Sequence, residues 1–224
     1  MFESLKLSDL HQKNGAMLRE PSSTRPVIWH IEEDGVKALV KDYRSNSFVF
    51  RNTVGRFLIW REAKAYRRLK GLKGVPSFFG VIDGLALILE EVEGRNVELL
   101  EKETRLPVRF FNALRHLVEQ VHARGLAHCD LKRAPNIIID RNGDPCIVDW
   151  SASISKREMR VFPLNRIYQK FIKDDFNAVI KLQLRHRPEA VDSETLKQYH
   201  YRGRAERLIR RVRDRARDLL QRIV

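Results

Sequence analysis

Two short runs with alternating apolar and polar positions stand out near the start of the chain. Val27 to Ile31 and Val36 to Tyr43 are rich in residues that favour strands, and Asp34-Gly35 between them is a favoured turn pair. This pattern predicts a β-hairpin. A third apolar run, from Leu85 to Leu89, is short enough to predict a further strand.

Apolar side chains spaced three or four residues apart predict two helices. The first runs from Val54 to Lys70, with Gly71 as its stop signal. The second runs from Pro107 to Arg124, and Gly125 ends it. The polar residues Glu90 to Gly94 lie between these regions and are expected to connect a smaller lobe to a larger one.

The last part of the chain is also expected to be helical. Asp174 or Asp175 is expected to start a helix that Pro188 closes. A final apolar stripe lies among many arginines, and its members are Leu208, Ile209, Val212, Ala216, Leu219, Leu220 and Ile223. This basic helix suits a membrane surface or a partner groove. Packing of the stripe on the larger lobe, with the arginines in water, is the favoured alternative.

The bulk composition limits the classes of protein to consider. The chain has 224 residues, enough for one two-lobed domain, and 43 Lys and Arg against 29 Asp and Glu give a net charge of +14. Such a surface attracts anions. The amino terminus lacks an apolar signal core, no run approaches roughly 18 apolar residues, and two cysteines form no disulfide pattern. We therefore expect a soluble, cytoplasmic protein.

The residues with the clearest chemistry lie on two predicted loops. The first holds His128-Cys129-Asp130-Leu131-Lys132 and, six residues after Asp130, Asn136. A predicted hairpin with Asn142-Gly143 at its turn then leads to Asp149. Transfer of the terminal phosphoryl group of ATP needs an Asp and an Asn to hold Mg²⁺ and a carboxylate to receive the acceptor's proton. Asp149, Asn136 and Asp130 can fill these places, and Lys132 can stabilise charge on the transferred group.

This stretch resembles the catalytic loop of the protein-kinase superfamily, H-R-D-L-K followed by N, and its D-F-G element, matched here by Asp149-Trp150-Ser151. The resemblance implies that Asp130 and Lys132 are catalytic. It also implies that Asn136 and Asp149 bind Mg²⁺, or Mn²⁺ as an alternative, and that ATP is the phosphoryl donor. The family's histidine in this loop is structural, so His128 is expected to brace the loop.

The amino-terminal part of the chain extends the resemblance. Ala38-Leu39-Val40-Lys41 matches the V-A-I-K strand, so Lys41 is expected to contact the ATP phosphates and to pair with Glu62. The backbone of the connector from Glu90 to Val92 is expected to bind adenine, with Leu89 lining the back of its pocket. The domain limits implied are residues 1–89 for the smaller lobe, 90–95 for the hinge and 96–224 for the larger lobe.

Three departures from the family pattern bear on activity. No glycine-rich loop precedes Lys41, and Ser22, Ser23 and Thr24 occupy its place, where their amides and hydroxyls can cover phosphates. Asn136 lies one position later than in the family, which implies either a bulge at residues 133–135 or an altered metal geometry. Cys129 replaces the loop arginine that reads a phosphorylated activation segment, and no A-P-E element follows.

The fold class expected is α+β: a two-lobed protein-kinase-like fold with a small antiparallel β-sheet and one helix in the first lobe and a compact, mostly helical second lobe. The abbreviated second lobe resembles lipopolysaccharide core kinases, which act on Kdo or heptose, and RIO-like and Bud32-like serine/threonine kinases. We expect a kinase acting on a hydroxyl, with a lipopolysaccharide core sugar placed slightly ahead of a protein serine or threonine.

Two other functions remain open. A pseudokinase or nucleotide-binding scaffold would account for the missing glycines. A RIO-like association with RNA particles would use the basic surface, although aromatics do not interleave the terminal arginines. Peripheral contact with an anionic inner membrane is a further partner hypothesis.

Overall fold

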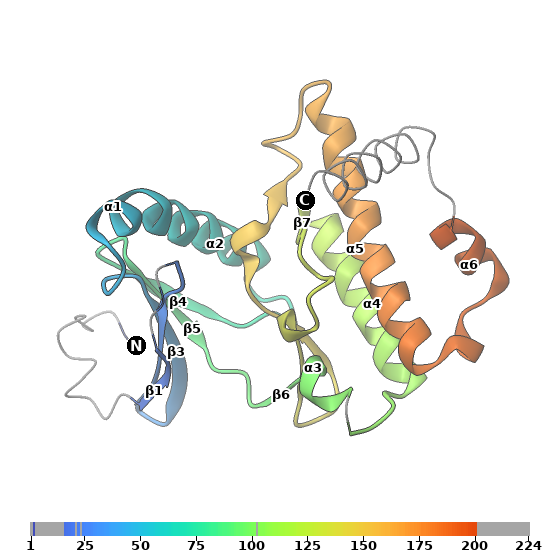
Figure 1. Ribbon diagram of the computed structural model, residues 1–224, viewed down its shortest axis with the longest axis horizontal. Coiled ribbons are helices and arrows are strands. Elements are labelled where there is room, and N and C mark those ends of the chain that lie inside the picture. The colour runs from blue at the N-terminus through green and yellow to red at the C-terminus, as the bar shows by residue number, and fades with distance from the viewer. Residues whose placement is uncertain (1, 3–15, 21, 23, 102, 201–224) are drawn as a thin grey trace, which may run out of the picture.

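The computed structural model describes residues 2, 16–20, 22, 24–101 and 103–200, apart from the side chains of Gln198 and His200. It shows two lobes, a β-sheet lobe with one long helix and a larger lobe in which helices dominate (Figure 1). The apolar stripe and arginines predicted for residues 208–223 lie outside the described residues. None of the described helices is long and apolar enough to cross a membrane.

The sheet of the first lobe is antiparallel throughout and has the strand order β1-β2-β3-β5-β4. Its strands are β1 (Ala16–Arg19), β2 (Val27–Glu33), β3 (Val36–Asp42), β4 (Phe78–Ile82) and β5 (Ala86–Glu90). The predicted β2–β3 hairpin is confirmed. Asp34 and Gly35 both have positive φ, at 52° and 75°, as the tight turn between twisted strands requires.

The predicted helix of the first lobe is present but begins earlier than Val54. α1 (Phe48–Phe50) continues through a π turn at Arg51–Gly55 into α2 (Arg56–Leu69). Ser47 starts it, because its side chain accepts a hydrogen bond from the backbone N–H of Phe50. At Gly55 a Cβ would lie 3.3 Å from the Tyr43 side chain, so glycine allows close packing on the sheet lobe.

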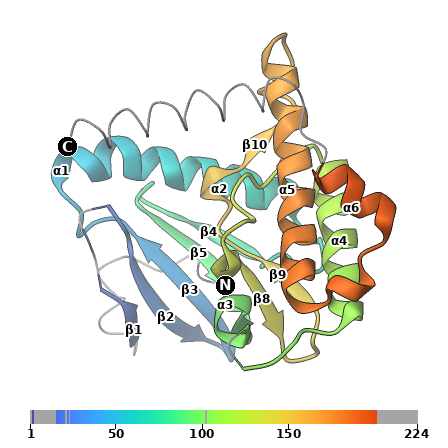
Figure 2. The same ribbon diagram turned by 45° about the vertical axis from the view of Figure 1, so that its right-hand side comes forward.

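The second lobe is built around two long helices that lie side by side (Figures 1 and 2). Its helices are α3 (Val97–Leu100), α4 (Val108–Ala123), α5 (Leu164–His186) and α6 (Ser193–His200). Its strands are β6 (Gly94–Asn96), β7 (Leu126–Ala127), β8 (Ile137–Asp140), β9 (Pro145–Ile147) and β10 (Ile154–Ser155). β8 and β9 form the predicted hairpin, and β6 adds to its other edge.

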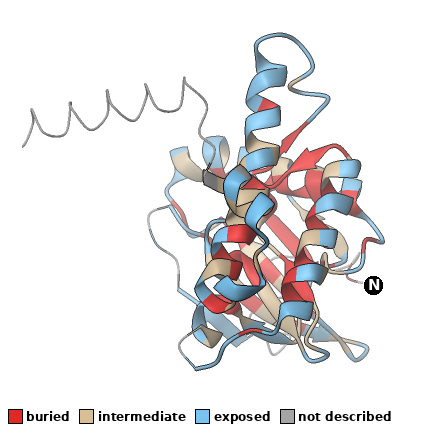
Figure 3. Ribbon diagram, turned by 90° about the vertical axis from the view of Figure 1, so that its right-hand side faces the viewer, coloured by how far each residue is buried: buried red, intermediate tan, exposed pale blue. Residues whose placement is uncertain are grey.

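The expected start of a helix at Asp174 or Asp175 is wrong. α5 begins at Leu164, ten positions before Asp174, and Asp175 lies inside it. The first half of α5 projects beyond the rest of the lobe and is largely exposed (Figure 3). Its apolar residues Leu164 and Ile167 are 40% and 41% exposed, while Tyr168 is buried in a small cluster with Ala127 and Ile154.

One apolar core continues from the first lobe into the second. Ile59 and Tyr66 of α2 belong to the same buried cluster as Phe110 and Leu114 of α4 and Trp150. A separate cluster, including Trp29 and Val40, covers the opposite face of the sheet. Strand alternation therefore leaves Lys41, the next residue of β3 after Val40, on the face turned toward the second lobe.

Candidate active site

An ion-pair triad joins the two lobes where the sequence predicts phosphate contacts. The Lys41 Nζ atom lies 2.6 Å from Glu62 Oε1 and 3.2 Å from Asp149 Oδ1. The predicted pair of Lys41 and Glu62 is therefore present. Glu62 is 3% exposed and sits beside the buried stripe of α2. A carboxylate so deeply buried is stable only with a cation beside it.

The triad keeps both of its cleft-facing groups charged. Burial alone would lower the pKa of Lys41, but the carboxylates of Glu62 and Asp149 outweigh it and raise that pKa above its usual range. Burial would raise the pKa of Asp149, yet the Lys41 ammonium and the Ser151 hydroxyl lower it to about 2. At neutral pH this site presents an ammonium and a carboxylate to any ligand.

Asn136 lies against the proposed catalytic carboxylate despite the longer loop. Its Nδ2 atom donates to the Asp130 carbonyl oxygen at 3.0 Å and lies 3.5 Å from Asp130 Oδ2. The extra residue is taken up by a 3₁₀ turn at Ala134–Asn136, in which the Asn136 N–H donates to the carbonyl of Arg133. The local irregularity expected at residues 133–135 is thus a turn that returns Asn136 to Asp130.

Asp175 anchors this loop, a role that the sequence analysis missed. Its carboxylate accepts hydrogen bonds from the backbone N–H groups of His128 at 2.7 Å and Cys129 at 3.0 Å. The same group lies 3.1 Å from His122 Nε2, and Asp175 is 2% exposed. The available signal was a carboxylate beside the apolar residues Phe176 and Val179, where burial demands hydrogen-bond partners.

His128 braces the loop as expected. Its Nε2 atom lies 3.0 Å from the Val148 carbonyl oxygen, and its Nδ1 atom is 3.3 Å from the backbone nitrogen of Asp130. Nε2–H donation to Val148 and acceptance at Nδ1 describe a neutral imidazole. Burial lowers the pKa of His128, which fits that form. The ring also packs against buried Trp150, with centroids 4.7 Å apart.

Asp149 is held in a backbone conformation that few side chains adopt. Its φ is 64°, in the left-handed region. Its Oδ1 atom accepts from the Ser151 hydroxyl at 2.9 Å as well as from Lys41. The Val148 N–H donates to the Asn136 carbonyl at 3.0 Å, so the two predicted metal ligands lie on neighbouring backbones. Strained residues of this kind concentrate at functional sites.

The oxygen atoms around this point suit a hard divalent cation. Lys41 and Ser151 both donate to Oδ1 of Asp149, which leaves Oδ2 of Asp149 for a ligand. Asn136 contacts Asp130 through its Nδ2 atom and not through its own Oδ1. Carboxylate and amide oxygens are ligands that Mg²⁺ prefers. Asp149 and Asn136 therefore fit the metal site that the resemblance implies.

Cys129, in the place of the family's arginine, carries no charge into the loop. Its φ is 69°, and its thiol lies 3.6 Å from the Ala127 carbonyl oxygen. Burial raises the pKa of this thiol to about 12, so it stays neutral and weakly nucleophilic at physiological pH.

The connector between the lobes borders an open pocket of about 320 Å³. Residues 91–93 join β5 to β6. The pocket is lined by His30, Lys37, Glu91, Val92, Glu93, Gly94 and Arg141.

The backbone of the connector is held at both of its ends. The N–H of Glu90 donates to the Ser77 carbonyl and that of Glu91 to the Lys37 carbonyl, while Leu89 is buried in the shared core. At Gly94 a Cβ would lie 2.2 Å from the Ile139 carbonyl oxygen, so only glycine fits this end of the connector.

Two described residues of the segment expected in place of the glycine-rich loop are exposed. Ser22 and Thr24 are both on the surface, and Ser23 lies outside the described residues. The buried side chain of Asn46 donates to the carbonyl oxygens of Ser22 at 2.8 Å and Arg25 at 3.2 Å. This contact places the segment beside the end of β3. It does not bring either hydroxyl to a charged group of the triad.

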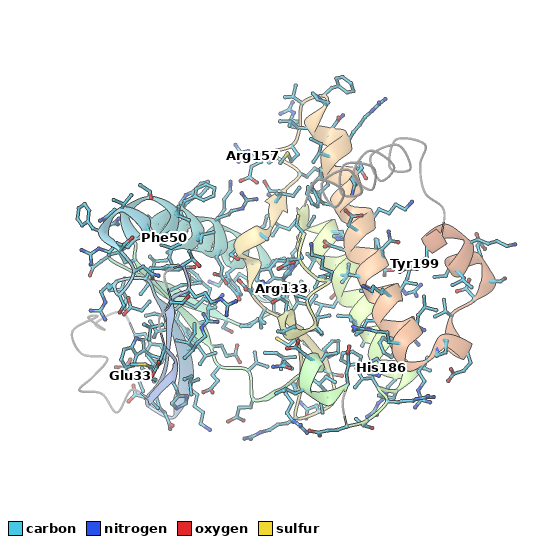
Figure 4. The ribbon with its side chains drawn as sticks, viewed as in Figure 1. Glu33, Phe50, Arg133, Arg157, His186 and Tyr199 are labelled. Atoms are coloured by element: carbon cyan, nitrogen blue, oxygen red, sulfur yellow. The ribbon has the colours of Figure 1, made fainter. Side chains whose placement is uncertain are left out.

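Lys132 and Arg133 are exposed beside Asp130, and Figure 4 shows Arg133 near the centre of the molecule, between the lobes. Arg133 Nη1 lies 3.6 Å from Asp130 Oδ2. Arg61 of α2 donates through Nε to the Ser153 carbonyl at 2.8 Å. That bond fixes the helix carrying Glu62 to the segment that follows Asp149.

Comparisons with known proteins found similarity in structure alone. No protein-family model and no curated protein matches the sequence. The Rio2 kinase from Chaetomium thermophilum matches with a TM-score of 0.60 and 15% identity over 83% of this chain. Its complex described with ADP, Mg²⁺ and phosphoaspartate gives 0.58 and 16% over the same share. The chain spans about three fifths of those proteins, 62% and 60%. It has a two-lobed protein-kinase-like fold.

Proposed function

We propose that the protein is an ATP- and Mg²⁺-dependent phosphotransferase that phosphorylates a hydroxyl group. The observation that carries this proposal is the convergence of the Lys41–Glu62–Asp149 triad with Asp130 and Asn136, from both lobes. Residues 108 positions apart, Lys41 and Asp149, are in direct contact. A chance likeness in one loop would not bring the remote lysine to it.

Each group has a distinct task in the proposed reaction. The acceptor oxygen forms a bond to the terminal phosphorus of ATP as the bond to the ADP oxygen breaks, and Asp130 receives the acceptor's proton. Lys41 stabilises the phosphates of the donor, and Lys132 stabilises charge on the transferred group. Asp149 and Asn136 would hold Mg²⁺, which neutralises phosphate charge when bound.

The connector supports a nucleobase in the proposed site. Because the N–H groups of Glu90 and Glu91 already donate within the first lobe, Val92 is the connector residue best suited to donate to adenine. Val92 also lines the open pocket. Leu89 supports this region from the core instead of lining that pocket.

The acceptor proposed is a hydroxyl on an anionic molecule, with a lipopolysaccharide core sugar ahead of a protein serine or threonine. Exposed Lys132 and Arg133 beside Asp130 support an anionic acceptor. Mass spectrometry of core oligosaccharide from a deletion strain tests the sugar. Loss of one phosphate supports it, whereas unchanged phosphate content would move the proposal to a protein acceptor.

The central test is phosphate transfer from labelled ATP to candidate acceptors. We expect Asp130→Ala and Lys41→Ala each to reduce transfer by about 10²-fold or more, because each removes a charged group from the reacting region. Lys73→Ala is the matched control, since Lys73 also pairs with a carboxylate, Asp144 at 2.8 Å, but on the surface. Nucleotide binding without any turnover in the wild type would instead indicate a scaffold.

A further inference from the structure

Two groups of large apolar side chains are exposed, one in each lobe. We call them together the apolar docking face, made up of Phe48, Val49, Val54, Phe57 and Trp60 in the first lobe and Val161, Phe162, Leu164 and Ile167 in the second. Val49 is 72% exposed, Trp60 53% and Phe162 66%. Single exposed apolar residues are ordinary, but clusters of this size mark interaction surfaces.

Both groups lie in strongly cationic segments. Residues 47–70 contain Arg51, Arg56, Arg61, Lys64, Arg67, Arg68 and Lys70, and their one acidic residue, Glu62, is buried against Lys41. Residues 156–173 contain Lys156, Arg157, Arg160, Arg166, Lys170 and Lys173. Their one acidic residue, Glu158, is paired with Lys64, and Lys170 is paired with the adjoining Asp174. The field around the apolar docking face is therefore positive.

Cations also lie directly over the exposed rings. Lys64 Nζ is 5.0 Å from the centre of Trp60, and the Arg51 guanidinium carbon is 5.4 Å from that of Phe48. In the second lobe the Arg166 guanidinium carbon lies 5.2 Å from the centre of Phe162. Ring and cation are thus presented to solvent together, as at a lipid interface, where aromatic rings sit at the headgroup level beside basic side chains.

The two groups belong to one side of the molecule. α2 and the projecting start of α5 both lie toward the top in Figures 1 and 2, and Arg157 lies between them in Figure 4. The Lys64–Glu158 ion pair and the bond from Arg61 to Ser153 join the segments that carry them. The apolar docking face therefore has one orientation set by the folded core.

We propose that this face docks on a lipid bilayer that contains anionic lipids. The charge argument requires an anionic partner, and the exposed rings require one that also accepts apolar side chains. Because the two apolar groups stand on separate elements, a fluid surface can receive both without a matching shape. Docking through these residues does not use the Lys41–Glu62–Asp149 triad, so it is independent of the proposed catalysis.

The test is co-sedimentation of the full chain with phosphatidylcholine vesicles, with and without phosphatidylglycerol. We expect binding only to the vesicles that contain phosphatidylglycerol. The pair Phe48→Ser/Trp60→Ser and the pair Phe162→Ser/Ile167→Ser should each weaken it by about tenfold or more. Reversal of charge in Arg157→Glu/Arg160→Glu should weaken it too and reduce its sensitivity to salt.

The matched control is Leu18→Ser/Leu99→Ser, because Leu18 and Leu99 are 57% and 48% exposed but lie outside the apolar docking face. It should bind vesicles like the wild type. Thermal unfolding of each variant, with and without ATP, checks that the fold persists. Wild-type affinity in the folded apolar variants, or equal binding to neutral vesicles, would overturn the proposal. Failure of the wild type to sediment with the vesicles would also overturn the proposal, even if the same face captured a protein partner.

Discussion

The proposed catalytic loop and the segment before β2 are expected to line the same cleft in the kinase resemblance, yet they differ sharply in how the protein holds them. Residues 128–149 are held by buried side chains. Asp175 accepts a hydrogen bond from the backbone of His128, and the His128 ring contacts the Val148 carbonyl and packs against Trp150. Ser22 and Thr24 are exposed, and the segment is fixed chiefly through its carbonyl oxygens by Asn46. The comparison indicates that buried contacts hold the proposed reacting groups and metal ligands in place. They do not hold the segment that is expected to cover the ATP phosphates in the same way.

Removal of Asp149 should produce the largest effect on activity. Asp149→Ala deletes a proposed metal ligand and a partner of Lys41, so we expect phosphate transfer to fall by about 10³-fold or more. Rates of acceptor phosphorylation measure it. Asp144→Ala, in the turn of the β8–β9 hairpin that precedes Asp149 and paired with exposed Lys73, is the control and should remain active. Substantial activity in Asp149→Ala would remove the proposed role of this residue in metal binding.

Removal of Asp175 should show how far the loop depends on its buried anchor. Asp175→Ala leaves the backbone N–H groups of His128 and Cys129 without their acceptor, so we expect the free energy of unfolding to fall by about 2–4 kcal/mol. Urea unfolding measures this loss. The adjacent Asp174 pairs with Lys170 on the surface, and Asp174→Ala should change stability little. Equal effects of the two substitutions would contradict the anchoring role.

Acidification should weaken the braced loop before it affects Asp149. The folded-state pKa of His128 is lowered, so the unfolded chain binds a proton more readily, and stability should decline as pH falls below about 6.5. Asp149, with a pKa of about 2, keeps its charge throughout that range. Unfolding measured from neutral pH to about pH 5 should show a shallower decline in His128→Gln. Buried His186, whose pKa is also lowered by burial, contributes to the decline that persists in this variant.

Substitution of the exposed hydroxyls should produce the smallest effect. For Ser22→Ala/Thr24→Ala we expect a change of no more than about twofold in the KM for ATP, since exposed positions without buried partners contribute little. Steady-state kinetics decide this. A rise in the KM for ATP as large as that of Lys41→Ala would contradict this contrast between the two regions. It would indicate that the side chains of Ser22 and Thr24 cover the ATP phosphates.

Local patterns were sufficient for the elements and contacts that depend on alternation, helical phase or a strong turn pair. The β2–β3 hairpin and the stripe of α2 follow from them, and the helical phase of Glu62 permits the pairing with Lys41 that the kinase resemblance implies. The start of α5 did not, because exposed Leu164 and Ile167 obscure the short inward stripe of Tyr168, Phe171 and Ile172. β4 was not anticipated either, and Gly80 within it is typical of loops.

The missed part of the site depends on distance along the chain. Asp175 lies 47 positions from His128, and nothing near either residue in the sequence connects them. The loop length at Asn136 left two structures open, and only the folded backbone shows the 3₁₀ turn. The roles of the site residues in binding ATP and metal stay predictions for the experiments above.

The apolar core shared by α2 and α4 has a consequence for how the molecule comes apart. Because the same buried cluster contains residues of both lobes, neither lobe can expose its interior without exposing that of its neighbour. Heating should therefore melt the chain as a single cooperative unit, with the calorimetric and van't Hoff enthalpies in agreement.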